Sequence, residues 1–212
     1  MARILIVTTL TVLFLLNANC CNSKRCLSLN DCKIIQENFS LNEIERLSKF
    51  LTYFDTRIIE KTGIDNKDSA YHKFCENLRG SSPTLINKQL QYSKLFNSTI
   101  NIDFISNPLF YEIWRTVSYK TVEGKNDFKG YELNNKNRFI LILKHLTKEY
   151  PVLEEYYEIV KSTGDITPSL ISGYPHVHNN LDFNDSLVRL WTFIHFATIH
   201  LNSEFYLRIP NE

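Results

Sequence analysis

The stretch that decides the fold is NDSLVRLWTFIHFATIHLNSEFYL, residues 184–207, close to the C-terminus. From Leu187 to Leu201 its apolar residues fall on nearly every side of a helix. A helix that faces solvent carries a polar stripe, whereas a helix that is apolar all round is buried. The stretch therefore predicts a long helix, beginning near Asn184 or Asp185, at the centre of the fold.

Amphipathic segments that would surround this helix precede it in the chain. The clearest begins at Ser40, which forms a capping box with Glu43 before an apolar stripe that runs to about Gly63. Further helices are expected over residues 65–79, 82–96, from 107 onward, 138–150 and 151–162. Strand signals are weak, and only residues 99–105 alternate briefly. The pattern predicts an all-α, single-domain bundle of six to eight helices.

Two segments have the composition of loops. Residues 124–135, GKNDFKGYELNN, are polar and contain two glycines. Residues 163–184 are rich in Gly, Pro and Asn. We therefore expect a long loop directly before the buried C-terminal helix.

The N-terminus has the three-part pattern of a signal peptide. Arg3 supplies the only charge, and Ile4–Leu16 is a run of 13 residues that are apolar apart from three threonines. A membrane-spanning helix needs about 20 apolar residues, so this run has the length of a signal-peptide core rather than of an anchor. We expect residues 1–19 to be a signal peptide and the protein to be exported.

The sequence around the predicted cleavage site, Leu15-Leu16-Asn17-Ala18-Asn19-Cys20, resembles a bacterial lipoprotein signal. The resemblance covers these six residues and implies lipidation of Cys20. Asn17 and Asn19 depart from the family pattern, which has Leu and a small residue there. Ordinary cleavage after Ala18 or after Cys20 also fits the small residues that signal peptidase prefers. The two outcomes, lipid-anchored or secreted, both remain open.

The chain has five cysteines, four of which fall within residues 20–32. In an exported protein such crowding indicates disulfide bonding. If Cys20 is lipidated or removed, an even set of four remains, and four cysteines allow three connectivities. The disulfide candidates are Cys21, Cys26, Cys32 and Cys75. We divide the chain into the signal peptide, a Cys-rich segment over residues 20–38 and a helical domain over residues 39–212.

The charge balance argues against several classes of partner. The full chain has 24 Lys and Arg against 23 Asp and Glu, and removal of Arg3 with the signal leaves 23 against 23. Binding to nucleic acid or to an anionic membrane surface usually requires a basic excess. We therefore expect no nucleic-acid partner, and membrane contact only through a lipid anchor.

The best candidate for chemistry is His176-Val177-His178, which falls in the predicted loop with Asp182 and Asp185 close behind. In an extended segment, residues i and i+2 point the same way. Both imidazoles would then reach one metal ion, with an aspartate as third ligand, and a metal-bound water could carry out hydrolysis. The alternative is two loop histidines that make ordinary surface hydrogen bonds.

Other titratable groups favour structural roles. His195 shares a helix face with Val188, Trp191 and Ile199, as a core histidine would. Glu154, Glu155 and Glu158 fit a solvated helix face better than an acid–base pair.

No P-loop, dinucleotide fingerprint, G-x-S-x-G or H-E-x-x-H motif is present, so we predict no cofactor. The leading hypothesis is an exported, non-enzymatic helical protein of the cell envelope or the medium that binds another protein or a small molecule. The alternative is a metal-dependent hydrolase built on the His-x-His segment.

Overall fold

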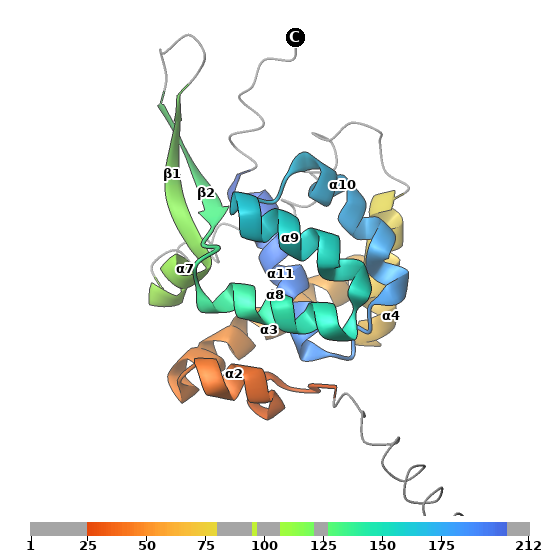
Figure 1. The fold of residues 1–212 in the computed structure, drawn as a ribbon. Helices are drawn as coiled ribbons and strands as arrows, with labels where there is room; N and C mark the ends of the chain where they lie inside the picture. The colour runs from red at the N-terminus through yellow and green to blue at the C-terminus, as the bar shows by residue number, and fades with distance from the viewer. Residues whose placement is uncertain (1–24, 80–94, 97–106, 121–126, 203–212) are drawn as a thin grey trace, which may run out of the picture.

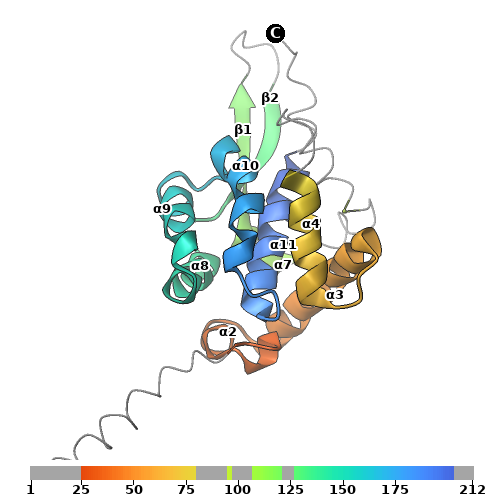
Figure 2. The same cartoon turned by 90° about the vertical axis from the view of Figure 1, so that its right-hand side faces the viewer.

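The computed structural model describes residues 25–79, 95–96, 107–120 and 127–202 (Figures 1 and 2). These ranges contain eight α-helices and one two-stranded sheet, which confirms the predicted all-α, single-domain bundle. The elements, in chain order, are η1 (Leu29–Asp31), α2 (Lys33–Asn38), α3 (Leu41–Thr62), α4 (Lys67–Arg79), α7 (Pro108–Ile113), β1 (Trp114–Lys120), β2 (Asp127–Leu133), α8 (Arg138–Glu149), η2 (Pro151–Leu153), α9 (Glu154–Thr163), α10 (Pro168–Val177), η3 (His178–Asn180) and α11 (Ser186–Leu201).

Helix α11 is the centre of the core, as its apolar sequence predicts. Every residue from Ser186 to Ile199 is buried, and the helix contacts α3, α8 and β2. Phe196 packs edge-on against Phe74 of α4 and Tyr174 of α10, and Figure 2 shows α11 running between these two helices. A helix enclosed on all sides has no polar stripe to present, which accounts for its composition.

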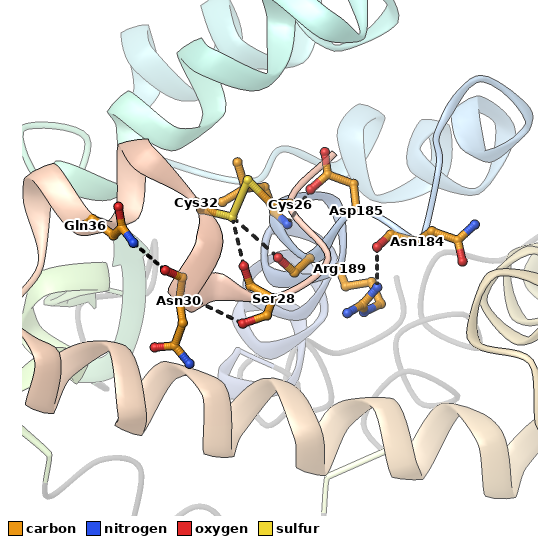
Figure 3. Close-up of a disulfide and its surroundings, with 10 residues drawn as sticks. Cys26, Ser28, Asn30, Cys32, Gln36, Asn184, Asp185 and Arg189 are labelled. Carbon is orange, nitrogen blue, oxygen red and sulfur yellow. Dashed lines mark hydrogen bonds between the residues drawn. A yellow bond between two sulfur atoms is a disulfide. The ribbon is translucent and has the colours of Figure 1, made fainter. Parts of the chain in front are cut away.

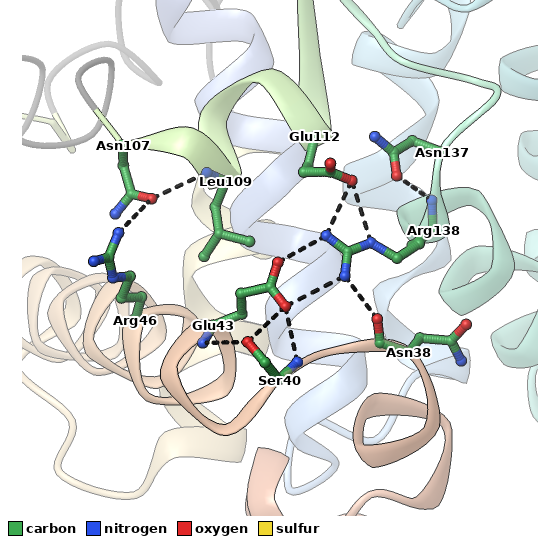
Figure 4. A network of polar contacts seen from close by, with 9 residues as sticks. All are labelled: Asn38, Ser40, Glu43, Arg46, Asn107, Leu109, Glu112, Asn137 and Arg138. Atoms are coloured by element: carbon green, nitrogen blue, oxygen red, sulfur yellow. Dashed lines mark hydrogen bonds and ion pairs between the residues drawn. The ribbon is translucent and has the colours of Figure 1, made fainter.

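The capping box predicted at the start of α3 is present and belongs to a larger polar network (Figure 4). The Glu43 carboxylate accepts from the Ser40 backbone N–H at 2.8 Å and from Arg138 at 2.8 Å. Arg138 also donates to the Asn38 carbonyl at 2.7 Å and pairs with Glu112 at 3.1 Å. One guanidinium at the start of α8 thus joins α2, α3 and α7, and its hydrogen bond is the main reason that the pKa of Glu43 falls to about 2.

The hairpin β1–β2 is absent from the sequence-based prediction, which gives a helix from residue 107 onward and a loop over 124–135. Helix α7 ends at Ile113, and residues 114–120 pair antiparallel with 127–133, from Trp114 opposite Leu133 to Lys120 opposite Asp127. Residues 114–120, WRTVSYK, are rich in β-branched and aromatic side chains, which favour strands.

Side chains of β1 and α11 hold the hairpin against the bundle. Trp114 is fully buried and donates from its indole nitrogen to Thr198 at 2.8 Å. The Asn202 amide, which follows α11, accepts from the Tyr131 N–H at 2.9 Å and donates to the Tyr131 carbonyl at 2.8 Å. Asn202 thus takes the place of a neighbouring strand along this part of β2.

The segment predicted as a long loop, residues 163–184, is mostly helical, and this part of the prediction is wrong. Thr167 caps α10 by accepting from the Leu170 N–H, and Pro168 occupies its first turn, where proline is favoured. Helix α10 then buries Leu170, Ile171 and Tyr174 in the core. Packing of this apolar face outweighs the presence of Gly173 and Pro175 within the helix.

Several predicted features lie outside the described residues. They are the signal peptide, Cys20, Cys21, most of the helix expected over 82–96, and the alternating segment 99–105. Among the residues that the structure does describe, no helix is both long and apolar enough to cross a membrane.

Candidate functional site

A pocket of about 200 Å³ lies between the η2–α9 segment and α10. One wall is formed by Val152, Leu153, Tyr156 and Ile159. The other wall is formed by Leu170, Gly173, Tyr174 and Val177. Glu155 and Ser169 are the two lining residues with polar side chains besides the tyrosines. The pocket is therefore an apolar slot with aromatic walls and one carboxylate, the general character of small-molecule sites.

Gly173 makes room in this slot. A Cβ built on Gly173 would meet no atom of a neighbouring residue within 4 Å. A Cβ atom at this position would therefore fit without displacing protein atoms. Gly173 thus lines the pocket with open space where a side chain would begin.

The two tyrosines that line the pocket are anchored by buried polar groups of α11. The Tyr156 hydroxyl shares a hydrogen bond of 2.7 Å with His195 Nδ1. The Tyr174 hydroxyl shares one of 2.7 Å with Thr192 Oγ1, and its ring stacks on the His195 ring at 4.2 Å between centroids. With their hydroxyls engaged, both tyrosines present ring surface to the pocket, so its aromatic walls are positioned before any ligand arrives.

His195, which contacts both tyrosines, is a neutral imidazole. It is fully buried, and burial lowers its pKa to about 3. Its Nε2 has no hydrogen-bond partner among the described residues. The prediction that His195 is a core histidine is confirmed by its burial, and its polar role is to hold Tyr156 in place.

The four residues predicted to bind a metal have different partners and surroundings in the structure. His176 and His178 lie at the α10–η3 boundary, where helical geometry turns successive residues by about 100°. His176 is exposed, Asp182 pairs with Arg25 at 2.5 Å, and Asp185 caps α11 by accepting from the Leu187 N–H at 2.9 Å. The prediction that His176 and His178 lie in an extended segment is therefore wrong. The described residues contain no group of three or more His, Cys, Asp or Glu that could hold a metal ion.

Buried His178 instead pairs with the partly exposed His72 of α4. Their Nδ1 atoms lie 3.0 Å apart, so one imidazole donates and the other accepts. Asp68 lies 3.6 Å from His72 Nε2 and accepts from the Phe183 N–H at 2.9 Å. Burial, followed by the neighbouring His72 and Arg79, lowers the pKa of His178. This chain of side chains attaches η3 and the following loop to α4.

Two of the disulfide candidates are paired. Cys26 and Cys32 form a disulfide beside the start of α11, where the Cys26 carbonyl accepts from the Ser186 N–H at 2.7 Å (Figure 3). Cys75 is a free, fully buried cysteine on the inner face of α4. Burial raises the pKa of its thiol to about 12.

The pocket was missed by the sequence-based prediction. The sequence predicts a solvated face for Glu154, Glu155 and Glu158, and all three are exposed, yet Glu155 also borders the pocket. The one available signal was Gly173 beside an apolar segment, since a glycine inside a helix often marks a close approach or an open space. Because residues 163–184 are predicted to be a loop, Gly173 is not recognised as a glycine inside a helix.

Comparison of the chain with protein-family models, with curated proteins and with solved structures finds no match.

Proposed function

We propose that this protein is an exported helical domain that binds a small, apolar molecule between α9 and α10. The observation that carries the proposal is the slot of about 200 Å³, which is lined by Tyr156 and Tyr174 and has open space beside Gly173. Binding, rather than catalysis, is favoured because the tyrosine hydroxyls and Ser169 at this site are occupied by protein partners.

The volume limits the ligand to a small one. An apolar cavity of about 150 Å³ holds benzene, so a slot of about 200 Å³ accommodates a single ring with a short chain. The apolar lining supplies a driving force of about 25 cal/mol for each Å² of apolar surface removed from water. A ligand of this size would be held by burial and shape, with affinity limited by its small area.

The binding test uses propylbenzene as the probe and Gly173→Leu as the blocking variant. We expect propylbenzene to raise the thermal unfolding temperature of the protein and to shift the amide NMR signals of α9 and α10, because a ligand that binds only the folded state stabilises it. Gly173→Leu places a side chain in the slot and should abolish both effects.

Ser172→Leu is the matched control. Ser172 neighbours Gly173 on α10, is partly exposed and does not line the pocket, so this variant should respond to propylbenzene as the native protein does. Equal responses of all three proteins, or no response of the native protein, would contradict the proposal.

Export is the second part of the proposal and is supported by the N-terminal sequence. The apolar run Ile4–Leu16 has the length of a signal-peptide core, and the Cys26–Cys32 disulfide fits an oxidising compartment. Expression in a bacterial host followed by intact-mass measurement tests it. Mass consistent with cleavage near residue 20 supports export, a diacyl addition on Cys20 identifies a lipid anchor, and an intact Met1 contradicts export.

A further inference from the structure

Glu155 is the one polar side chain of the pocket lining that is left available to a ligand. The Tyr156 and Tyr174 hydroxyls are bonded to His195 and Thr192, and the Ser169 hydroxyl lies 2.8 Å from Thr167 Oγ1. Glu155, by contrast, makes no hydrogen bond or ion pair with another residue that the structure describes. The hydroxyl groups of the pocket lining are therefore already hydrogen-bonded within the protein, and the Glu155 carboxylate is the polar group that a ligand can engage.

The charged side chains at the start of α9, beside the pocket, are both acidic. Helix α9 begins with Glu154 and Glu155, which are both exposed. Helix α10, PSLISGYPHV, has no Lys or Arg, and its basic residue, His176, lies in the last turn. The basic residue of α9, Lys161, is at its far end and pairs with Glu158 at 3.4 Å. The Glu155 carboxylate at this edge of the pocket therefore attracts cations and repels anions.

We propose that the pocket prefers a small apolar molecule that carries an amine. This preference rests on the proposed ligand-binding function. The ring or short alkyl body packs against Tyr156 and Tyr174, whose own rings contact each other edge to face at 5.8 Å between centroids, and the ammonium group meets the Glu155 carboxylate at the edge of the slot. The aromatic walls add to this preference, since the negative faces of tyrosine rings also attract cations. A neutral isostere gains the same burial without the charge interaction.

The preference expected from one exposed carboxylate is modest and measurable. Two unit charges about 4 Å apart in water attract with an energy that corresponds to a factor of about five in affinity. The amine should therefore bind about fivefold more tightly than its neutral isostere. The corresponding carboxylic acid, ionised at neutral pH, should bind more weakly than either.

The experiment compares three probes of nearly equal shape: phenethylamine, propylbenzene and 3-phenylpropionate. Dissociation constants are measured by NMR titration of the mature protein at low salt. We expect the order phenethylamine, then propylbenzene, then 3-phenylpropionate, with the tightest first. In Glu155→Gln the advantage of phenethylamine over propylbenzene should disappear, whereas the affinity for propylbenzene should stay the same.

Glu154→Gln is the matched control, because it removes the same charge from the neighbouring exposed residue that does not line the pocket. It should preserve most of the advantage of phenethylamine. If propylbenzene binds as tightly as phenethylamine, or if Glu155→Gln leaves the order unchanged, the amine preference is wrong while ligand binding stands. If none of the three probes binds, the proposed function and the preference both fail.

Discussion

At the scale of single residues, burial decides which side chains are charged. His195 lies within the core beneath Tyr174, and its pKa is lowered to about 3 because the charged imidazolium would lose its hydration there. Tyr156, its hydrogen-bonding partner, has a pKa raised well above 10 by burial. Both groups are therefore neutral at physiological pH, and the hydrogen-bonded pair of Tyr156 and His195 carries no net charge.

The lowered pKa of His195 predicts a loss of stability in acid. The unfolded chain, with a histidine pKa near 6.5, binds the proton before the folded protein does. The stabilising effect of neutral His195 is therefore complete above about pH 6.5 and is lost progressively as the pH falls toward 3. Between pH 7.5 and pH 5 the loss is about 2 kcal/mol.

Replacement of this residue provides the measurement. His195→Gln cannot titrate but retains a polar group for Tyr156. Urea unfolding near pH 7.5 and pH 5 should show that the native protein loses about 2 kcal/mol more than the variant over this interval. Parallel losses in the two proteins would mean that His195 is not the group responsible. His178, whose pKa is also lowered by burial, contributes in the same direction in both proteins.

At the scale of elements, a buried ion pair joins α3 and α11. Asp55 and Arg189 are each about 5% exposed and lie 3.2 Å apart. Asp55 also accepts from the Tyr71 hydroxyl at 2.7 Å, and Lys67 lies 2.9 Å from its second oxygen. Arg189 donates to the Phe183 carbonyl at 2.6 Å. The network thus fixes α3, α4 and α11 relative to each other.

Removal of both members of this pair should cost less than the sum of the two single removals. Arg189→Leu leaves the Asp55 carboxylate buried with Lys67 as its remaining charged neighbour, and we expect a loss of about 3 kcal/mol, with a similar loss for Asp55→Leu. The double variant should lose clearly less than the sum, because no unpaired charge is left in the core. Urea unfolding of the four proteins measures this coupling, and additive losses would argue against a coupled pair.

At the scale of the whole molecule, the core rather than the disulfide supplies most of the stability. Central helix α11 contacts α3, α8 and β2, whereas Cys26 and Cys32 are six residues apart. Closing so short a loop contributes about 2 kcal/mol. The bundle should therefore remain folded when this bond is reduced.

Thiol labelling tests this expectation. In reductant at neutral pH, the protein should keep its circular dichroism spectrum and lose about 2 kcal/mol of stability.

Cys75 should resist alkylation in native buffer, because it is fully buried and its thiol pKa is raised to about 12. It should react in denaturant. Rapid labelling of Cys75 in the native protein would contradict the packing of α4 against the core.

The elements that were predicted correctly have local signals. The start of α3 follows from Ser40 and Glu43, whose reciprocal hydrogen bonds involve residues three apart. The break after α8 follows from Pro151, which disfavours helix at the residue before it. Such features depend on neighbours in the chain, so they can be read without knowledge of the fold.

The elements that were missed depend on distant partners. The sequence near Trp114 suits a helix or a strand, and its pairing with Leu133 and its bond to Thr198 decide for the strand. Residues 168–177 contain Gly173 and Pro175, which indicate a loop, yet burial of the apolar face of α10 makes the helix favourable. Local propensities span only about 1 kcal/mol per residue for most residues, which tertiary packing readily exceeds.

The sequence by itself determined the class of the fold and its central helix, because an all-round apolar segment of this length must be buried wherever the other helices lie. Only the tertiary structure decided the site. His176 and His178 are neighbours in the chain but take different surroundings, whereas Tyr156, Tyr174 and His195 come together from three helices. Contacts between residues far apart in the chain have no local pattern, so the pocket between α9 and α10 appears only when the core is assembled.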